Sequence, residues 1–405
     1  MDVATLNRHP AVDRARTTLR ERDAETLAAM IELAQIPAPP FGESARGERM
    51  RRWFEELGLR DVAVDEVGNV LAWYPANGSA QDRAGEYGPV LICAHLDTVF
   101  PPETDVTVRR VGERLVGPGI ADNARGLAAL IALAGALVEA RPSLARSVVF
   151  AATVGEEGVG DLRGVKHLFR EDSPWRRAAA FIALDGTGTR RIVNRALGSR
   201  RYRVTIEGSG GHSWADWGRA NPIHALGRAI AALDAIDLPR RPRTTLSVGR
   251  IEGGTAVNAI PTEAWLELDI RSEGANALDA VEAKALREIK RAVVATERHS
   301  RGSDSPLALR FERIGDRPSG ETPAASPLVA AACAATRMIG EEPELAASST
   351  DANIPISLGI PAIAMGAGGR SSGVHTPDEW YENDGGPEGL DRALLTLVAA
   401  AGLEM

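Results

Sequence analysis

The sequence predicts an α/β protein into which a smaller α+β domain is inserted. Short, strongly apolar strands alternate with Ala- and Leu-rich helices before residue 198, and the same pattern returns near Pro318. Between these segments, half-apolar strands and amphipathic helices follow the order β-α-β-β-α-β, which is the split-βαβ plan of a small α+β domain. The chain has 405 residues, enough for two domains with separate cores.

The composition argues against several classes of protein. The net charge of −8 and the lack of a basic patch with interleaved aromatic residues disfavour nucleic-acid binding. The first residues contain no apolar segment of a signal peptide, and no apolar run approaches the length of a membrane span. We therefore expect a cytoplasmic protein without a membrane partner. Cys93 and Cys333 lie in apolar segments and are expected to be small buried hydrophobes.

Periodicity and helix-breaking residues predict the elements of the first α/β segment. Apolar residues on one helical face predict helices at 23–34 and 44–57, and the prolines at 37–40 end the first of them. Residues 62–74 predict two strands turned at Gly68-Asn69, followed by a polar loop at 75–88. Apolar runs at 89–94, 146–154 and 178–184 predict buried strands, and an Ala/Leu-rich helix is expected to end near residue 139.

The inserted domain and the last segment follow by the same reasoning. Strands are expected at 202–207, 244–251, 264–271 and 307–314, with helices at 221–234 and 278–296. After the insert we expect a helix at 325–339, a strand at 361–366 and a closing helix from 387.

Several predicted strands of the α/β domain, or the loops after them, end in a side chain that can bind a metal ion. In open α/β sheets, ligands gather beyond the carboxyl ends of the strands. These residues are His95, Asp122, Glu156, Glu157, Asp185 and His375. On extended backbone, Asp97 points to the same side as His95, so it could hold the imidazole ring.

Taken singly, these residues also have ordinary structural explanations. His95 could be a buried core histidine, Asp122 a helix N-cap and Asp185 a turn former. Glu156 and Glu157 are harder to explain, because two adjacent carboxylates between glycines either raise a pKa or surround a cation. Ligands of nitrogen and carboxylate oxygen, without thiolate, suit Zn²⁺, or Mn²⁺ or Co²⁺. Three carboxylates and one hydroxide would balance the charge of two divalent ions.

In order along the chain, the motifs resemble those of the M20 family of dinuclear metallopeptidases and amidohydrolases. This family includes glutamate carboxypeptidases, tripeptidase T, acetylornithine deacetylase and succinyl-diaminopimelate desuccinylase. The motifs are His95-x-Asp97, Gly117-x-Gly-x-x-Asp122, Gly155-Glu156-Glu157, Asp185-Gly186, Gly-Gly-His212-Ser, Gly253-Gly-Thr-Ala-Val-Asn258, Asp269-Ile-Arg271 and His375-Thr-x-Asp-Glu. Glu157-Gly-x-Gly-Asp161 and Ser349-Thr-Asp351-Ala-Asn353 are most similar to the tripeptidase-like branch.

The resemblance implies a phosphorylase/hydrolase-like catalytic domain with a mixed sheet at residues 1–198 and 316–405. It also implies that residues 199–315 form a ferredoxin-like lid and dimerisation domain, so the expected assembly is a homodimer. The expected cofactor is two divalent metal ions, with Zn²⁺ favoured.

The resemblance also implies a role for each site residue. Asp122 would bridge the two metal ions, with a cis peptide bond to Asn123. The remaining metal ligands would be His95 and Asp185 for one ion, and Glu157 and His375 for the other. Asp97 would orient His95, and Glu156 would be the general base on a metal-bridging water. The substrate contacts would be His212, which donates to the oxyanion from a partner subunit, and Asn258 and Arg271, which hold a substrate carboxylate.

The predicted function is hydrolysis of a peptide or N-acyl amide bond in a small carboxylate-bearing substrate. A catalytically silent metal- or peptide-binding protein on the same fold is the alternative. An NAD-binding protein is disfavoured, because the glycines at 117 and 119 lack the third glycine and the downstream acid of a dinucleotide site. Aminopeptidase, carboxypeptidase and deacylase activities all stay open.

Some residues of the resemblance keep structural alternatives. His212 could be an ordinary surface histidine, and Arg271 could be a structural ion-pair partner. Asp351 and Asn353 could line the pocket or cap a helix. The Trp214 and Trp217 pair could shape specificity or pack the inserted domain.

Overall fold

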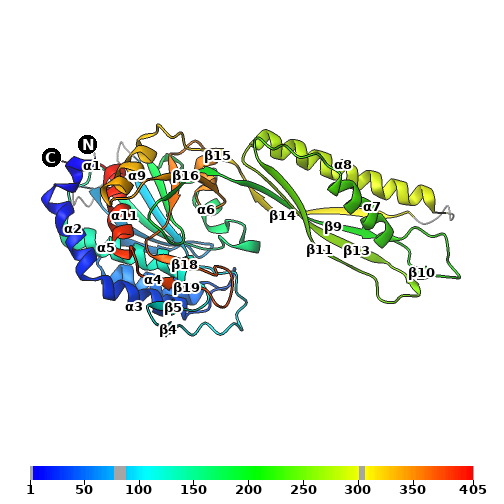
Figure 1. Ribbon diagram of the computed structural model, residues 1–405, viewed down its shortest axis with the longest axis horizontal. Helices are drawn as coiled ribbons and strands as arrows, with labels where there is room; N and C mark the ends of the chain where they lie inside the picture. Colours follow the sequence, from blue (N-terminus) through cyan, green and yellow to red (C-terminus); the bar gives the residue numbers. More distant parts are fainter. Residues whose placement is uncertain (1–2, 77–87, 301–305, 405) are drawn as a thin grey trace. The chain divides into compact units, whose positions relative to one another are not determined.

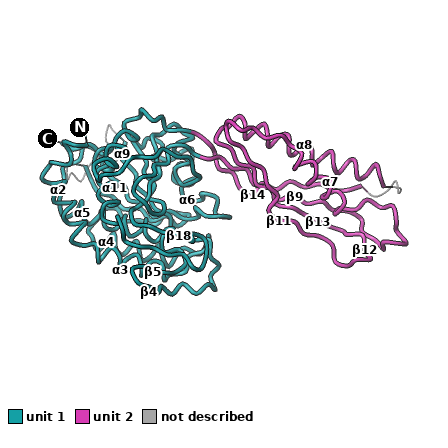
Figure 2. The backbone as a smooth tube through the Cα atoms, viewed as in Figure 1, with its two compact units in different colours: residues 1–196, 321–405 teal, residues 197–320 magenta. Residues whose placement is uncertain are grey.

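In a computed structural model of the chain, the structure describes residues 3–76, 88–300 and 306–404. The chain divides into two compact units, shown in different colours in Figure 2. Unit 1 comprises residues 1–196 and 321–405, and unit 2 comprises residues 197–320. The expected polar loop at 75–88 falls largely outside the described residues.

Unit 1 is built on a mixed sheet, as predicted (Figure 1). The strand order is β1-β2-β6-β3-β7-β17-β8-β15, and β16 pairs with β8. The strands β6, β3, β7 and β17 run parallel to one another, whereas β1 and β2 form an antiparallel edge. The strand bounds are β1 Arg60–Val64, β2 Val70–Tyr74, β3 Val90–His95, β6 Val148–Thr153, β7 Ala180–Leu184, β8 Arg191–Ala196, β15 Gly320–Glu321, β16 Glu344–Ser348 and β17 Ala362–Met365.

Helices cover both faces of this sheet, which explains why its central strands β3, β6 and β7 are continuous apolar runs. One face packs against α1 Val3–Asn7, α2 Pro10–Glu21, α3 Asp23–Ala34, α4 Ser44–Glu56, α5 Arg125–Ala140, α9 Pro327–Met338 and α11 Gly386–Ala401. The other face packs against the short helices α6 Arg163–Leu168 and α10 Asn353–Ser357. The helices α1 and α2 were not among the elements predicted from the sequence.

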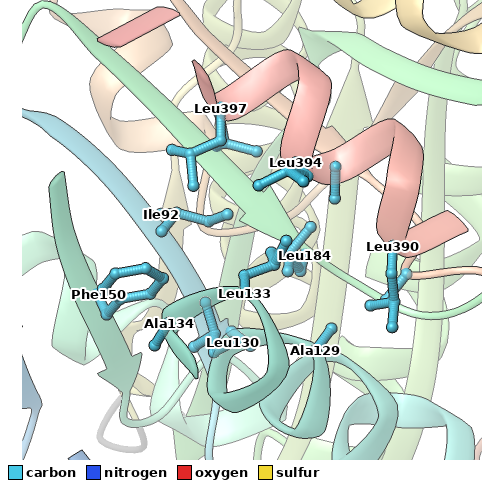
Figure 3. Packing of buried hydrophobic residues seen from close by; sticks show 14 of the residues in the cluster. Ile92, Ala129, Leu130, Leu133, Ala134, Phe150, Leu184, Leu390, Leu394 and Leu397 are labelled. Atoms are coloured by element: carbon cyan, nitrogen blue, oxygen red, sulfur yellow. The ribbon is translucent and has the colours of Figure 1, made fainter. Parts of the chain in front are cut away.

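Alternation along β3 distributes its side chains between the two layers. Ile92 belongs to the cluster of α5 and α11, whereas Leu91 and Cys93 belong to the cluster on the opposite face. Figure 3 shows Ile92 close to Leu133 of α5 and Leu394 of α11. Among the described residues, the one stretch long and apolar enough to cross a membrane is 120–140, and 78% of its apolar window is buried, as for a core helix.

A small antiparallel sheet lies beside the main one in unit 1 and was not predicted. Its order is β18-β19-β5-β4, with bounds β4 Arg109–Val111, β5 Arg114–Val116, β18 Arg370–Ser372 and β19 Trp380–Glu382. Trp380 pairs with Val116 in this sheet. The segment after residue 370 is thereby held against the segment that precedes α5.

Unit 2 has the predicted element order β-α-β-β-α-β. Its antiparallel sheet has the order β11-β13-β9-β14, and α7 and α8 pack on one apolar face. The bounds are β9 Gly198–Glu207, α7 Pro222–Asp234, β11 Thr244–Gly253, β13 Glu263–Ser272, α8 Ala275–His299 and β14 Ala308–Arg317. A short ladder pairs β10 Gly211–His212 with β12 Ala259–Ile260. A role of this unit as a lid or dimerisation domain stays a prediction.

Candidate metal centre

Five of the predicted metal ligands in unit 1 converge on two neighbouring positions. His95, Asp122 and Asp185 offer ligand atoms that all lie within 4.8 Å of one another. Asp122, Glu157 and His375 form a second group of the same size, so Asp122 belongs to both. The ligands come from the ends of β3 and β7, from the loop after β6, and from the segments before α5 and after β18.

Asp122 lies between the two histidines and contacts each through a different oxygen. Its Oδ1 is 3.0 Å from Nε2 of His95, and its Oδ2 is 3.2 Å from Nε2 of His375. His375 Nε2 is also 2.8 Å from Oε1 of Glu157, and His95 Nε2 is 3.9 Å from Oδ1 of Asp185. Each oxygen of the Asp122 carboxylate thus faces a different histidine.

The hydrogen bonding of His95 fits a metal ligand. Its Nδ1 donates to the backbone carbonyl of Asp97 at 3.0 Å, so a neutral ring has its lone pair on Nε2. That lone pair faces a lone pair of Asp122 at hydrogen-bond distance. Two acceptors this close need a positive charge between them, which a divalent cation can supply. Nitrogen and carboxylate oxygen are the ligands of Zn²⁺ and its neighbours.

The electrostatics of the centre follow from the same contacts. Hydrogen bonds to Asp122 and Glu157 raise the pKa of His375 to about 10. Burial alone lowers the pKa of His95, but its contacts with Asp122 and Asp97 raise it well above the ordinary value. Burial and the charge of Asp122 raise the pKa of Asp185 to about 7. The site therefore attracts positive charge, whether protons or metal ions.

Both the backbone carbonyl and the carboxylate of Asp97 face the ring of His95, and the role of Asp97 in orienting this ring stays a prediction. The ring is held by the backbone carbonyl of Asp97, whereas the Asp97 carboxylate is 3.6 Å from the same ring nitrogen. The carboxylate accepts the backbone N–H of Glu156 at 2.9 Å and that of Glu157 at 2.8 Å. Asp97 thus fixes the backbone of Glu156 and Glu157. One ligand atom from each of these two glutamates and one from His95 also lie within 4.8 Å of one another.

The interpretation of Asp122 as a helix N-cap is wrong. The residue before α5 is Ala124, and no side chain caps that helix. Asp122 has φ −120° and ψ 93°, outside helical geometry, and its peptide bond to Asn123 is cis, as the resemblance implied.

Asn123 and Glu379 support this loop, although no supporting role was predicted for either residue. Asn123 donates through Nδ2 to the carbonyl of Leu184 at 2.9 Å, which ties the loop to the end of β7. Glu379 is buried and accepts hydrogen bonds from the loop backbone. Burial raises its pKa to about 7, although the backbone N–H groups act in the opposite direction. Both act through partners distant in sequence, so local pattern offered no signal for them.

Two of the predicted substrate contacts lie side by side in unit 2. The short ladder pairs His212 with Ala259, and Ser213 N donates to the carbonyl of Asn258 at 2.9 Å. Arg271 lies on β13 and donates through Nε to Asp269 at 2.6 Å.

His212 is fixed by the turn that follows it. Its Nδ1 accepts the backbone N–H groups of Trp214 at 3.1 Å and Ala215 at 3.3 Å, and its own N–H donates to Asp216 at 2.7 Å. A neutral ring in this arrangement carries its proton on Nε2. Trp214 is 86% exposed and Trp217 is 75% exposed, so neither is packed within unit 2.

Asp351 and Asn353 both lie buried in unit 1. Asn353 accepts the N–H of Thr350 at 2.9 Å, which is a local turn contact. Asp351 accepts the hydroxyl of Thr153 at 2.6 Å at the end of β6, and its charge helps to raise the pKa of Asp185. Asn353 thus has a structural contact, whereas Asp351 acts electrostatically on a predicted ligand.

Comparisons with known proteins found a matching family model and several similar proteins. A family model described as peptidase family M20/M25/M40 matches residues 91–400. A putative succinyl-diaminopimelate desuccinylase of Mycobacterium tuberculosis (strain CDC 1551 / Oshkosh) is 29% identical over 310 residues, which cover 74% of this chain and 79% of that protein. The uncharacterised protein YqjE of Bacillus subtilis (strain 168) is 26% identical over 369 residues, which cover 87% and 92%.

Two solved structures share the fold. The aminopeptidase PepT from Bacillus cereus ATCC 10987 has a TM-score of 0.73 at 23% identity, with 93% of this chain and 98% of that chain covered. The YXEP protein of Bacillus subtilis, described as a dinuclear metal binding peptidase from the M20 family, has a TM-score of 0.66 at 18% identity, with 94% and 98% covered.

Proposed function

We propose that this protein is a dinuclear enzyme that acts on small amides. The chain belongs to peptidase family M20/M25/M40 and is a metal-dependent hydrolase. The proposed reaction is hydrolysis of a peptide or N-acyl amide bond in a small carboxylate-bearing substrate. The observation that carries the proposal is the sharing of Asp122 between two groups of ligand atoms.

We propose Zn²⁺ as the metal, with Mn²⁺ or Co²⁺ as alternatives. His95 and Asp185 would complete one position, and Glu157 and His375 the other, with Asp122 common to both. When bound, such ions polarise the scissile carbonyl and lower the pKa of bound water to about 7.

Glu156 is the proposed general base. It is 5% exposed, and the bond from its backbone N–H to Asp97 fixes its main chain. A carboxylate oxygen of Glu156 lies within 4.8 Å of ligand atoms of His95 and Glu157, which brings it beside the centre. A base must come within about 3 Å of the water that it deprotonates. Glu156 would take the proton from the attacking water and pass it to the leaving nitrogen.

His212 is the proposed oxyanion donor, supplied by the partner subunit of a homodimer formed through unit 2. Because Nδ1 accepts the N–H groups of Trp214 and Ala215, the proton on Nε2 is free to be donated to the oxyanion. One such donor contributes about 3 kcal/mol to the transition state.

Asn258 and Arg271 would hold the substrate carboxylate. The contact of Arg271 Nε with Asp269 fixes the plane of the guanidinium group. Its two terminal nitrogens can then form the bidentate pair that suits a carboxylate.

The test combines a metal titration with a substrate panel. Metal-free protein is titrated with Zn²⁺, and the loaded protein is assayed on dipeptides, tripeptides and N-acyl amino acids. We expect two ions per chain and turnover of one substrate group, which also separates aminopeptidase, carboxypeptidase and deacylase activities. Two bound ions without turnover on any substrate would favour the silent binding protein instead.

A substitution tests the role of the base separately. Glu156→Gln should keep both metal ions and lower turnover by about 10²–10⁴-fold, the usual contribution of a general base. Glu103→Gln, the same change at an exposed position, should leave turnover unaltered. Near-native turnover of Glu156→Gln would remove Glu156 from this role.

A further inference from the structure

A buried carboxylate far along the chain holds the loop that carries Asp122. Glu379 has 0% exposed surface, and its side chain accepts the backbone N–H of Gly119 at 3.1 Å, of Ala121 at 2.7 Å and of Asp122 at 2.9 Å. We propose that Glu379 is a positioning residue that fixes Asp122 between the two metal ions. This inference rests on the dinuclear function proposed above.

The loop needs partners from elsewhere because its own backbone is not helical. Asp122 and Asn123 both have φ/ψ values outside the helical region. Gly119 has φ 71°, and a Cβ at that position would lie 2.6 Å from Cγ2 of Thr98, so the chain passes through a tight space. Buried N–H groups without helical partners must be satisfied in another way. The Glu379 carboxylate satisfies three of them with charge-assisted hydrogen bonds.

Glu379 also connects the segments that carry two predicted ligands, His375 and Asp122. It lies four residues after His375, and its N–H closes a turn onto the carbonyl of Thr376 at 3.1 Å. Its own carbonyl accepts the N–H of Gly117 at 2.9 Å. Main-chain and side-chain bonds of one residue therefore join the His375 segment to the Asp122 segment. The pairing of β19 with β5 continues this connection.

The geometry explains why this position holds a carboxylate. Oε2 accepts from Gly119, while Oε1 accepts from both Ala121 and Asp122. Both oxygens of the group must therefore be acceptors. A glutamine offers one acceptor oxygen, so it can keep at most the two bonds of Oε1 and would turn an amide N–H₂ toward Gly119.

The experiment measures metal binding rather than turnover. Metal-free wild type, Glu379→Gln and Glu379→Ala are titrated with Zn²⁺ in competition with a chromophoric chelator, and their unfolding in urea is measured without metal. Glu382→Gln is the matched control. It lies on β19 three residues further on and pairs with Arg114 and Arg370, which lie outside the loop.

Replacement of a residue that hydrogen-bonds a metal ligand typically lowers metal affinity by about 10–100-fold. We expect a loss of about ten-fold for Glu379→Gln, which keeps two of the three bonds, and of about one hundred-fold for Glu379→Ala. Glu382→Gln should bind Zn²⁺ as the wild type does. If Glu379→Ala does not fold, the Zn²⁺ affinity of Glu379→Gln alone tests the inference.

A purely structural role predicts a different pattern. Lower resistance to urea with unchanged Zn²⁺ affinity in the Glu379 variants would overturn the inference. A wild type that binds fewer than two ions would instead refute the dinuclear function, whatever the Glu379 variants do.

Discussion

Replacement of Asp97 by Asn is the sharpest test of how the carboxylate pair is held. Asp97 is 0% exposed, and its two oxygens accept the backbone N–H groups of Glu156 and Glu157 at 2.9 and 2.8 Å. Asn has nearly the same shape but one acceptor oxygen, so one N–H would face an amide N–H₂. The loss combines a charge-assisted hydrogen bond, worth about 1.5–3 kcal/mol, with a buried donor left unsatisfied at about 1–3 kcal/mol.

These two costs overlap, so we expect Asp97→Asn to lower the free energy of unfolding by about 3 kcal/mol. Arg46 adds to the effect, because the charge of Asp97 opposes the burial that lowers the pKa of Arg46 to about 10. Turnover should also fall by about 10²-fold, the cost of misplacing a catalytic group by about 1 Å.

The assay is urea unfolding of the metal-free protein, with the midpoint compared at an unchanged slope. Asp105→Asn is the matched control, since Asp105 lies at the surface and accepts a single backbone N–H from Thr107 at 3.0 Å. The urea midpoint of Asp105→Asn should match that of the wild type. An equally small change for Asp97→Asn would refute the reasoning about the carboxylate pair.

Three further predictions concern the metal ions and unit 2. His95→Ala should lose one metal ion, while Asp122→Asn should weaken both, as measured by elemental analysis after dialysis; full occupancy in either variant would contradict the ligand set. Because hydrogen bonds to Asp122 and Glu157 raise the pKa of His375 to about 10, this ring is protonated at pH 8 without metal. Zn²⁺ uptake at pH 8 should therefore release protons and weaken as the pH falls below 10, and calorimetry in two buffers of different ionisation enthalpy would detect the absence of release. Joint replacement of Trp214 and Trp217 by Ala should change unfolding by less than about 0.5 kcal/mol while raising KM, whereas a large destabilisation would indicate a packing role.

Apolar runs and helical periodicity in the sequence predicted those elements in which the same pattern of burial continues from end to end. The strand predicted at 89–94 is β3 at Val90–His95, because burial on both faces produces one continuous apolar run. The helix predicted at 23–34 is α3 at Asp23–Ala34. The small sheet of β4, β5, β18 and β19 was missed, because three-residue strands carry too little periodicity to detect.

The candidate site divides in a similar way. The ends of buried strands marked His95 and Asp185, because a change from apolar to titratable residues is visible in sequence. For Asp122, local sequence left a helix cap and a metal ligand both open, and the role as a ligand came from the resemblance, since local sequence does not show that its two oxygens face histidines from other segments. Glu379 was missed as a support because the N–H groups that it accepts lie more than 250 residues away.

The strands through which the chain enters and leaves unit 2 are immediate neighbours. β9 begins at Gly198, β14 ends at Arg317, and Ser199 is paired with Arg317 in their antiparallel ladder. Paired residues in such a ladder lie about 5 Å apart, a gap that a short turn bridges. The inserted unit can therefore be deleted or exchanged for another domain at a single junction. Such a change would not interrupt any central strand of the large sheet of unit 1.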